Sequence, residues 1–186
     1  MNFTAIDFET AHACFPCEIG LARVENGKIA ETKSWLIKPA CFPYMNPYHE
    51  RVHGISAEQL VSAKTFDELW GELKLWLDEQ IVVAHNAPFD MGVLRASLAH
   101  YDLAVPYMDY FCSVQVARKV WKQLASHSLG NLCQFHNIRF EHHRAGDDAK
   151  ACASIVLKSF ENINSCDITE GLNKLNVKMR KLRNNF

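Results

Sequence analysis

The alternation of hydrophobic and polar positions predicts that the chain opens with three antiparallel strands. Residues 3–10 are rich in apolar, β-branched and aromatic side chains, as in a buried strand. Residues 18–24 and 29–37 continue as strands, and Asn26-Gly27 between them is typical of a tight hairpin turn. Residues 11–17 are expected to form a loop after the first strand.

Helical spacing of apolar residues dominates the middle of the chain. Thr65 and Glu68 form the pattern of a capping box, and apolar residues then repeat at helical spacing up to residue 77. Residues 81–84 are all apolar, as in a central strand buried on both faces. Further predicted elements are a helix after Ser56, a helix from Asn86 to about residue 100, a strand over 107–112, and helices over 114–121, 128–135 and 147–160.

The segment after Glu170 differs from the rest in charge. It carries five basic residues and no acid: Lys174, Lys178, Arg180, Lys181 and Arg183. Leu172, Leu175, Met179 and Leu182 form an apolar stripe, which predicts a basic amphipathic helix. We therefore expect a main domain over residues 1–164 and a basic helical tail over residues 165–186, packed on that domain or extending from it. The tail either presents a solvated basic face or supplies contacts to phosphate groups.

Length and composition indicate an ordinary globular protein. The chain has 186 residues, of which 48% are hydrophobic, and this length supports one sizeable core. The net charge of −1 does not indicate nucleic-acid binding by the surface as a whole, so such binding would need a local basic patch or metal ions. No stretch is long and apolar enough to span a membrane, and no signal peptide is recognisable, which favours a cytoplasmic protein.

The seven cysteines include one closely spaced pair, Cys14 and Cys17. A zinc site would need two further ligands, and no second pair follows at zinc-finger spacing. A thioredoxin-like pair would precede a helix, whereas this pair precedes a predicted strand. We interpret the pair as accidental, with a redox or metal role as the alternative.

Four acidic residues stand at the ends of predicted elements. Asp7 and Glu9 point to the same side of the first strand, either as solvated acids or as an acidic pair that needs a cation between them. Asp90 falls on the inward stripe of the helix after residue 86, and Asp148 on the buried side of the last long helix. Asp147 is expected to point toward solvent as the N-cap.

Four carboxylates can share a pocket only if cations neutralise them. Hard oxygen ligands select Mg²⁺ or Mn²⁺, and two such ions about 4 Å apart can activate water and stabilise the leaving oxygen of a phosphodiester. The reaction also needs a base, and histidine is suited to this role near pH 7. His143, five residues before Asp148, can reach the same pocket, with His142 as its rival. His85 faces this site or serves a structural role at the strand end.

Three segments resemble the motifs of the DEDDh, or DnaQ-like, family of 3′→5′ exonucleases, which includes the proofreading epsilon subunit of bacterial DNA polymerase III. They are Asp7-Phe8-Glu9-Thr10, Asn86-Ala87-Pro88-Phe89-Asp90 and the segment from His143 to Ala149. Two linking segments also look like family segments: residues 52–56, with His53-Gly54-Ile55, and residues 128–133. The resemblance covers about residues 3–160. Cys112-Ser113 stands where many members have Asp-Thr, which leads us to expect altered local hydrogen bonding.

The resemblance implies an α/β, RNase H-like fold with a mixed five-stranded sheet, three antiparallel strands followed by two parallel ones. It implies that Asp7, Glu9, Asp90 and Asp148 bind two divalent metal ions, Mg²⁺ or Mn²⁺, and that His143 is the general base. By position, Phe8, Thr10, His53 and Asn86 would line the pocket of the terminal nucleotide.

The implied substrate is nucleic acid with a free 3′ end, with single-stranded DNA as the first choice and RNA as the second. Nucleoside 5′-monophosphates would be the products. A second hypothesis is a proofreading or binding module within a polymerase complex, although the short basic tail favours a stand-alone enzyme. Some members of the family form homodimers, and nothing in the pattern decides this for the present chain.

Overall fold

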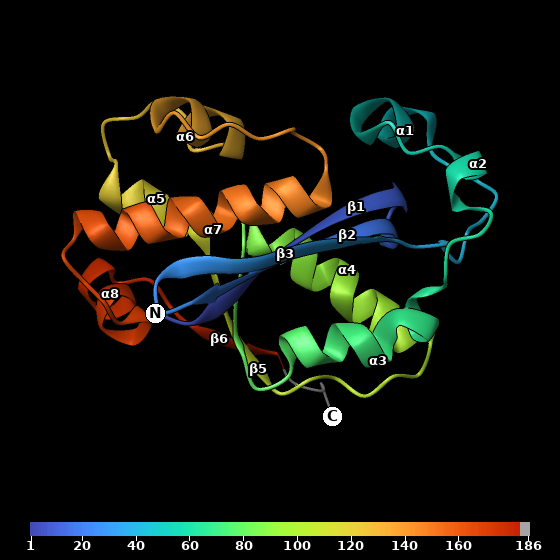
Figure 1. Cartoon of the computed structure of the whole chain (residues 1–186), viewed down its shortest axis with the longest axis horizontal. Helices are drawn as coiled ribbons and strands as arrows, with labels where there is room; N and C mark the ends of the chain where they lie inside the picture. Colours follow the sequence, from blue (N-terminus) through green and yellow to red (C-terminus); the bar gives the residue numbers. More distant parts are fainter. Residues whose placement is uncertain (183–186) are drawn as a thin grey trace.

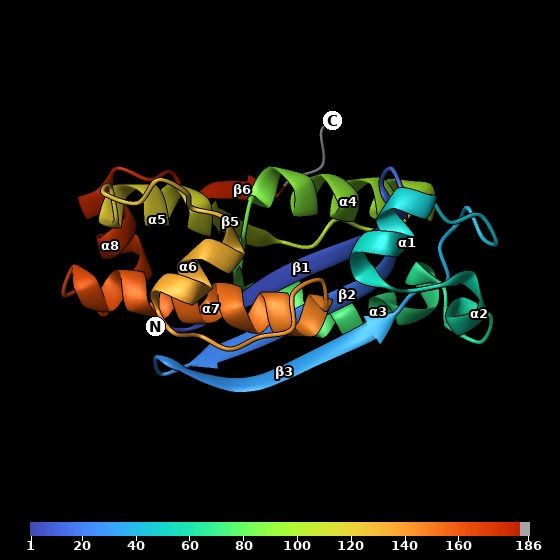
Figure 2. The same ribbon diagram turned by 90° about the horizontal axis from the view of Figure 1, so that it is seen from above.

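The computed structural model describes residues 1–182, which build a mixed sheet between two layers of helices (Figures 1 and 2). The strands are β1 (Phe3–His12), β2 (Phe15–Glu25), β3 (Lys28–Leu36), β4 (Ile81–Ala84), β5 (Met108–Cys112) and β6 (Arg180–Leu182). Their order is β3-β2-β1-β4-β5-β6. The first three are antiparallel, β4 and β5 run parallel to β1, and β6 is antiparallel to β5.

Alternation along β1 sends side chains to two cores on opposite faces of the sheet. Ile6 and Phe8 pack with the helices α3 and α4, whereas Phe3 and Ala5 pack with α7 and α8. The helices are α1 (Pro47–His53), α2 (Ala57–Leu60), α3 (Phe66–Leu77), α4 (Ala87–His100), α5 (Ser113–Val120), α6 (Leu129–Phe135), α7 (Ala145–Asn162) and α8 (Ile168–Leu175). By this alternation Asp7 and Glu9 lie on the face that α7 covers.

The prediction of a loop over residues 11–17 is wrong, because β1 and β2 stay paired almost to the turn that joins them. His12 pairs with Phe15, and only Ala13 and Cys14 form the turn. Ala11 and Cys17 are fully buried, and burial of these apolar side chains stabilises the extended pairing of β1 with β2. The structure also contains α1, which the sequence analysis did not predict; Asn46 caps it by accepting a hydrogen bond from the Tyr48 N–H at 2.9 Å.

The last long helix begins earlier than expected. Helix α7 starts at Ala145 with Arg144 at the N-cap, so the expectation of Asp147 as N-cap is wrong. Asp147 lies in the first turn, where its Oδ2 accepts a hydrogen bond from the Glu141 N–H at 3.4 Å. The capping box of α3 is confirmed: Glu68 Oε2 accepts the Thr65 N–H at 2.7 Å.

The tail is not the single helix that its apolar stripe predicted. Helix α8 ends at Leu175, where Asn176 adopts the left-handed conformation (φ 51°) and terminates it. The chain then forms β6, which makes the sheet six-stranded rather than five-stranded, and Leu182 is buried opposite Met108 of β5. Arg183, counted in the basic tail, lies outside the described residues. Among residues 1–182, no helix has the length and apolarity needed to cross a bilayer.

Candidate active site

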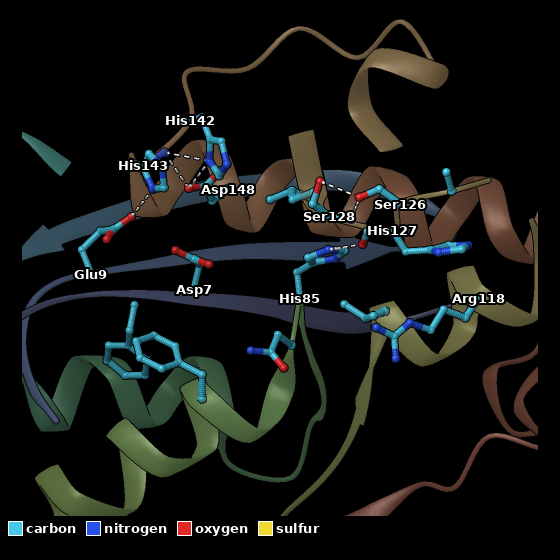
Figure 3. A pocket seen from close by; sticks show the side chains of 16 residues that line it. Asp7, Glu9, His85, Arg118, Ser126, His127, Ser128, His142, His143 and Asp148 are labelled. Carbon is cyan, nitrogen blue, oxygen red and sulfur yellow. Dashed lines mark hydrogen bonds and ion pairs between the residues drawn. The ribbon is translucent and has the colours of Figure 1, made fainter. Parts of the chain in front are cut away.

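A cleft opens where the carboxyl ends of β1 and β4 meet the start of α7, and it encloses about 720 Å³ (Figure 3). Strand β1 contributes Asp7 and Glu9, and α7 contributes Asp148. His142 and His143 come from the segment that precedes α7. The carboxyl ends of these parallel strands therefore bring the acidic side chains and histidines together at one end of the strands, as is typical of α/β proteins.

Asp7, Glu9 and Asp148 offer oxygen atoms that all lie within 4.8 Å of one another. Asp90 does not belong to this set of oxygens; it is only 1% exposed, and its Oδ1 accepts the Phe8 N–H at 3.1 Å. Burial, followed by repulsion from Asp90, Asp148 and the other acids, raises the pKa of Asp7 well above its ordinary value. Burial also raises the pKa of Asp90, and it raises that of Glu9 to about 7 with help from Asp148.

This donor set fits a hard divalent cation. Three converging carboxylates provide only oxygen ligands, which suit Mg²⁺ or Mn²⁺. Burial first, and then repulsion among the acids, raises the pKa values of Asp7, Glu9 and Asp90, so both effects oppose ionisation of the cluster. A cation among the oxygens would remove that repulsion.

Two residues that the sequence analysis did not single out bring α7 to the acidic pair. Gly20 of β2 pairs with Asp7, and a Cβ atom at Gly20 would lie 1.9 Å from the Ala145 carbonyl oxygen. Only glycine therefore allows the first turn of α7 to rest on β2. Buried Glu18 holds the same turn, because its Oε2 accepts the Ala145 N–H at 3.1 Å. The sequence signal for this close approach is Gly20 itself, a glycine in the middle of a predicted strand.

Both candidate histidines border the acidic cluster. His143 Nδ1 lies 3.6 Å from Glu9 Oε1, and the His143 N–H donates to Asp148 Oδ2 at 2.8 Å. His142 Nδ1 lies 3.1 Å from Asp148 Oδ1, and the two imidazole rings stack with centroids 3.9 Å apart. Burial lowers the pKa of His143 and the neighbouring His142 lowers it further, although Asp148 opposes this. His143 therefore faces Glu9, whereas His142 faces Asp148.

The four residues proposed to bind substrate separate into two groups. Phe8 and Asn86 line the cleft. Thr10 and His53 are buried outside its lining, where His53 Nε2 lies 3.2 Å from the Thr10 carbonyl oxygen. His53 Nδ1 accepts the Ile55 N–H at 3.0 Å, so Nε2 carries the proton and donates to Thr10. In this structure His53 joins α1 to β1.

The far side of the cleft includes His85, Arg118 and Ser126, which lie outside the family-like segments. His85 lines the cleft, and its Nε2 donates to the His127 carbonyl oxygen at 3.0 Å, which ties the loop before α6 to the end of β4. Its Nδ1 lies 2.8 Å from the Ser113 hydroxyl, at the position where Cys112-Ser113 departs from the family pattern. Burial lowers the pKa of His85 to about 4, so it is neutral near pH 7. Arg118, Ser126 and Ser128 complete this side.

A family model described as Exonuclease (RNase_T) matches residues 4–156, and the chain belongs to this family. The DNA polymerase III PolC-type protein of Thermotoga maritima is 31% identical over an alignment of 177 residues that covers 91% of this chain. The PolC-type protein of Clostridium perfringens is 31% identical over an alignment of 150 residues that covers 78% of this chain. The chain covers only 12% and 10% of the lengths of these two relatives.

Solved structures agree with the fold. Exonuclease X in complex with 5′ overhanging duplex DNA superimposes with a TM-score of 0.75 at 22% identity, and covers 93% of this chain and 98% of its own. The nuclease domain of 3′hExo, a DEDDh family member bound to rAMP, gives a TM-score of 0.72 at 15% identity, with 97% of each chain covered. The expected RNase H-like exonuclease fold and the resemblance to the DEDDh, DnaQ-like exonucleases are confirmed.

Proposed function

We propose that this protein is a metal-dependent 3′→5′ exonuclease that releases nucleoside 5′-monophosphates from the 3′ end of a nucleic-acid strand. The observation that carries the proposal is the convergence of Asp7, Glu9 and Asp148, with buried Asp90 hydrogen-bonded to the N–H of Phe8 between Asp7 and Glu9. Two histidines border these acids in a cleft of about 720 Å³. Membership of the exonuclease family supports the same chemistry.

Asp7, Glu9, Asp90 and Asp148 are the residues that would hold two divalent ions, with Mg²⁺ or Mn²⁺ suited to the oxygen donors. When bound, such ions supply Lewis acidity for activating water and neutralise negative charge at the phosphodiester. Asp90 also orients β1, because its carboxylate accepts the N–H of Phe8, which lies between Asp7 and Glu9. Asp90 would thus bind an ion and also hold the strand that carries Asp7 and Glu9.

His143 is the proposed general base that takes the proton from the attacking water. Its lowered pKa keeps the imidazole neutral near pH 7, which a base requires. The hydrogen bond from its backbone N–H to Asp148 fixes the start of the side chain beside the cluster. His142 is the rival, and its ring lies against Asp148 rather than Glu9.

The cleft walls suit a nucleotide. Phe89 is 45% exposed at the cleft and offers an aromatic face on which a base can stack. Asn86 offers amide hydrogen bonds beside it, and Arg118 is the only arginine or lysine among the described residues that line the cleft. Both DNA and RNA present a phosphodiester and stackable bases to these groups. We propose single-stranded DNA as the first substrate and RNA as the second.

The PolC-type relatives favour one further candidate: proofreading within a polymerase assembly. They are DNA polymerases that contain a segment similar to this chain. Under this proposal the chain would act on the 3′ end delivered by a polymerase partner. Co-purification with a replicative polymerase at physiological salt tests it, and absence of binding to that polymerase would count against it.

One degradation assay tests the exonuclease proposal. The substrates are 5′-labelled single-stranded DNA and the matching RNA, each incubated with Mn²⁺ or with EDTA. We expect a ladder that shortens from the 3′ end and vanishes with EDTA and with Asp7→Asn. Loss of the base in His143→Ala should lower the rate by about 10²- to 10⁴-fold, and more than His142→Ala does.

The matched control is Asp147→Asn, which removes the neighbouring acid of α7 that does not line the cleft. This variant should keep wild-type activity. Activity that survives Asp7→Asn or EDTA would refute the metal assignment. An unchanged rate in His143→Ala would assign the base elsewhere.

A further inference from the structure

A second cavity, of about 190 Å³, lies beside the start of α4, between α4 and the edge of the sheet formed by β5 and β6. Figure 2 shows β5 and β6 between α5 and α4. Three basic side chains line the cavity: Arg95 from α4, Lys178 from the segment before β6, and Arg180 from β6 itself. We refer to this cavity, with Arg95, Lys178 and Arg180, as the basic groove.

Within residues 1–182, the positive charge of the basic groove has no acidic partner. No aspartate or glutamate belongs to its lining among the described residues. The ion pairs found over residues 1–182 involve none of the three cations. The Nε atom of Arg95 is buried without a hydrogen-bond partner, which is costly for a charged donor. Because the net charge of the chain is −1, this positive site is a local feature.

The basic groove and the cleft adjoin the same two helix starts. On α4, Asn86 and Phe89 line the cleft, whereas Ala87 and Pro88 line the groove. On α5, Val114 lines the cleft and the next residue, Gln115, lines the groove. A strand that leaves the cleft across the starts of α4 and α5 would therefore enter the basic groove.

We propose that the basic groove binds backbone phosphates of the substrate strand, at nucleotides upstream of the one held in the cleft. The inference rests on the proposed nuclease function. Cations that contact phosphates read no bases, so this binding is independent of sequence and weakens with salt. The groove would hold the remainder of the strand while its 3′ end reacts.

Equilibrium binding to a long single-stranded oligonucleotide in EDTA tests the proposal, because EDTA prevents cleavage. Lys178→Gln and Arg180→Gln remove exposed cations and leave the cleft residues in place. Each should weaken binding about two- to fivefold and lower the slope of log affinity against log salt by about 0.7. Lys28→Gln is the matched control, since this exposed lysine lies on β3, at the opposite edge of the sheet. The control should bind as the wild type does.

Hydrolysis of a dinucleotide in Mn²⁺ separates the groove from the cleft. The short substrate fills the cleft alone, so Lys178→Gln and Arg180→Gln should cleave it at the wild-type kcat/KM while losing kcat/KM on the long strand. Arg180→Lys, which keeps the charge, should retain binding of the long strand.

Two results would overturn the inference: wild-type affinity in both groove variants, or polyglutamate binding that matches nucleic acid in affinity and is lost in the same variants. The latter would assign the groove to an acidic protein partner. If the wild type binds the long strand through the groove but cleaves neither substrate, the proposed nuclease function fails, and only the assignment of the groove as a phosphate-binding site for nucleic acid is supported.

Discussion

Glu9→Gln should stabilise the metal-free protein at alkaline pH although it removes a proposed metal ligand. Burial and the nearby Asp148 carboxylate raise the pKa of Glu9 from 4.5 to about 7. The folded protein therefore binds this proton more tightly than the unfolded chain does. The resulting stability is complete below pH 4.5 and is lost as the pH rises through 7.

The size of the effect follows from the pKa shift. A difference of about 2.5 units between the folded and unfolded states corresponds to about 3 kcal/mol of unfolding free energy, fully lost by about pH 8. His143 does not offset this loss, because its lowered pKa leaves it uncharged at that pH. Glutamine keeps the shape of Glu9 without the charge, so the variant avoids the loss.

Urea unfolding in EDTA, measured from pH 4.5 to pH 8 for both proteins, tests this reasoning. The two curves should coincide at the acidic end, and Glu9→Gln should become more stable by up to about 3 kcal/mol at pH 8. Excess Mg²⁺ should reverse the order, because ion binding stabilises the folded wild type more than the variant. Equal stability at every pH in EDTA, or a more stable wild type at pH 8, would refute the reasoning.

Two further predictions concern how the site is held. Gly20→Ala should lower both thermal stability and activity, because the new Cβ atom would collide with the Ala145 carbonyl. Gly71→Ala, in mid-α3 with open space around it, should instead stabilise the protein by about 0.5–1 kcal/mol in a thermal melt. A Gly20→Ala variant that is more stable than Gly71→Ala would contradict the close approach of α7 to β2 at Gly20. Asp90→Leu should destabilise by about 1–3 kcal/mol in urea, because it leaves the buried Phe8 N–H unpaired. Asp90→Asn keeps an acceptor and should be more stable than Asp90→Leu, although it too should lose activity. Equal stability of the two variants would contradict the role of this hydrogen bond.

Local pattern was sufficient to predict most elements and the faces on which the four acids lie. Period-two alternation placed Asp7 and Glu9 on one side of β1, and the helical stripes placed Asp90 and Asp148 on buried faces. These expectations hold because side-chain direction depends mainly on the local backbone. The family resemblance added the fold, and the match over residues 4–156 confirms it.

Element ends depended on tertiary contacts. Residues 180–182 continue an apolar stripe at helical spacing, yet they form β6, because the edge of β5 offers hydrogen bonds and buries Leu182. Likewise β1 and β2 extend toward their turn because Ala11 and Cys17 find a core that no local pattern shows.

The assembly of the site was also decided only by the tertiary structure. Close approach of α7 to β2 at Gly20 brings Asp148 to the acidic pair, although the two segments are far apart in sequence. The basic groove likewise joins Arg95 of α4 to Arg180 of β6. Local backbone periodicity dictates which side chains each element presents, so this information can be read from the order of residues. Which of these side chains meet depends on long-range packing, which arises only when the chain folds.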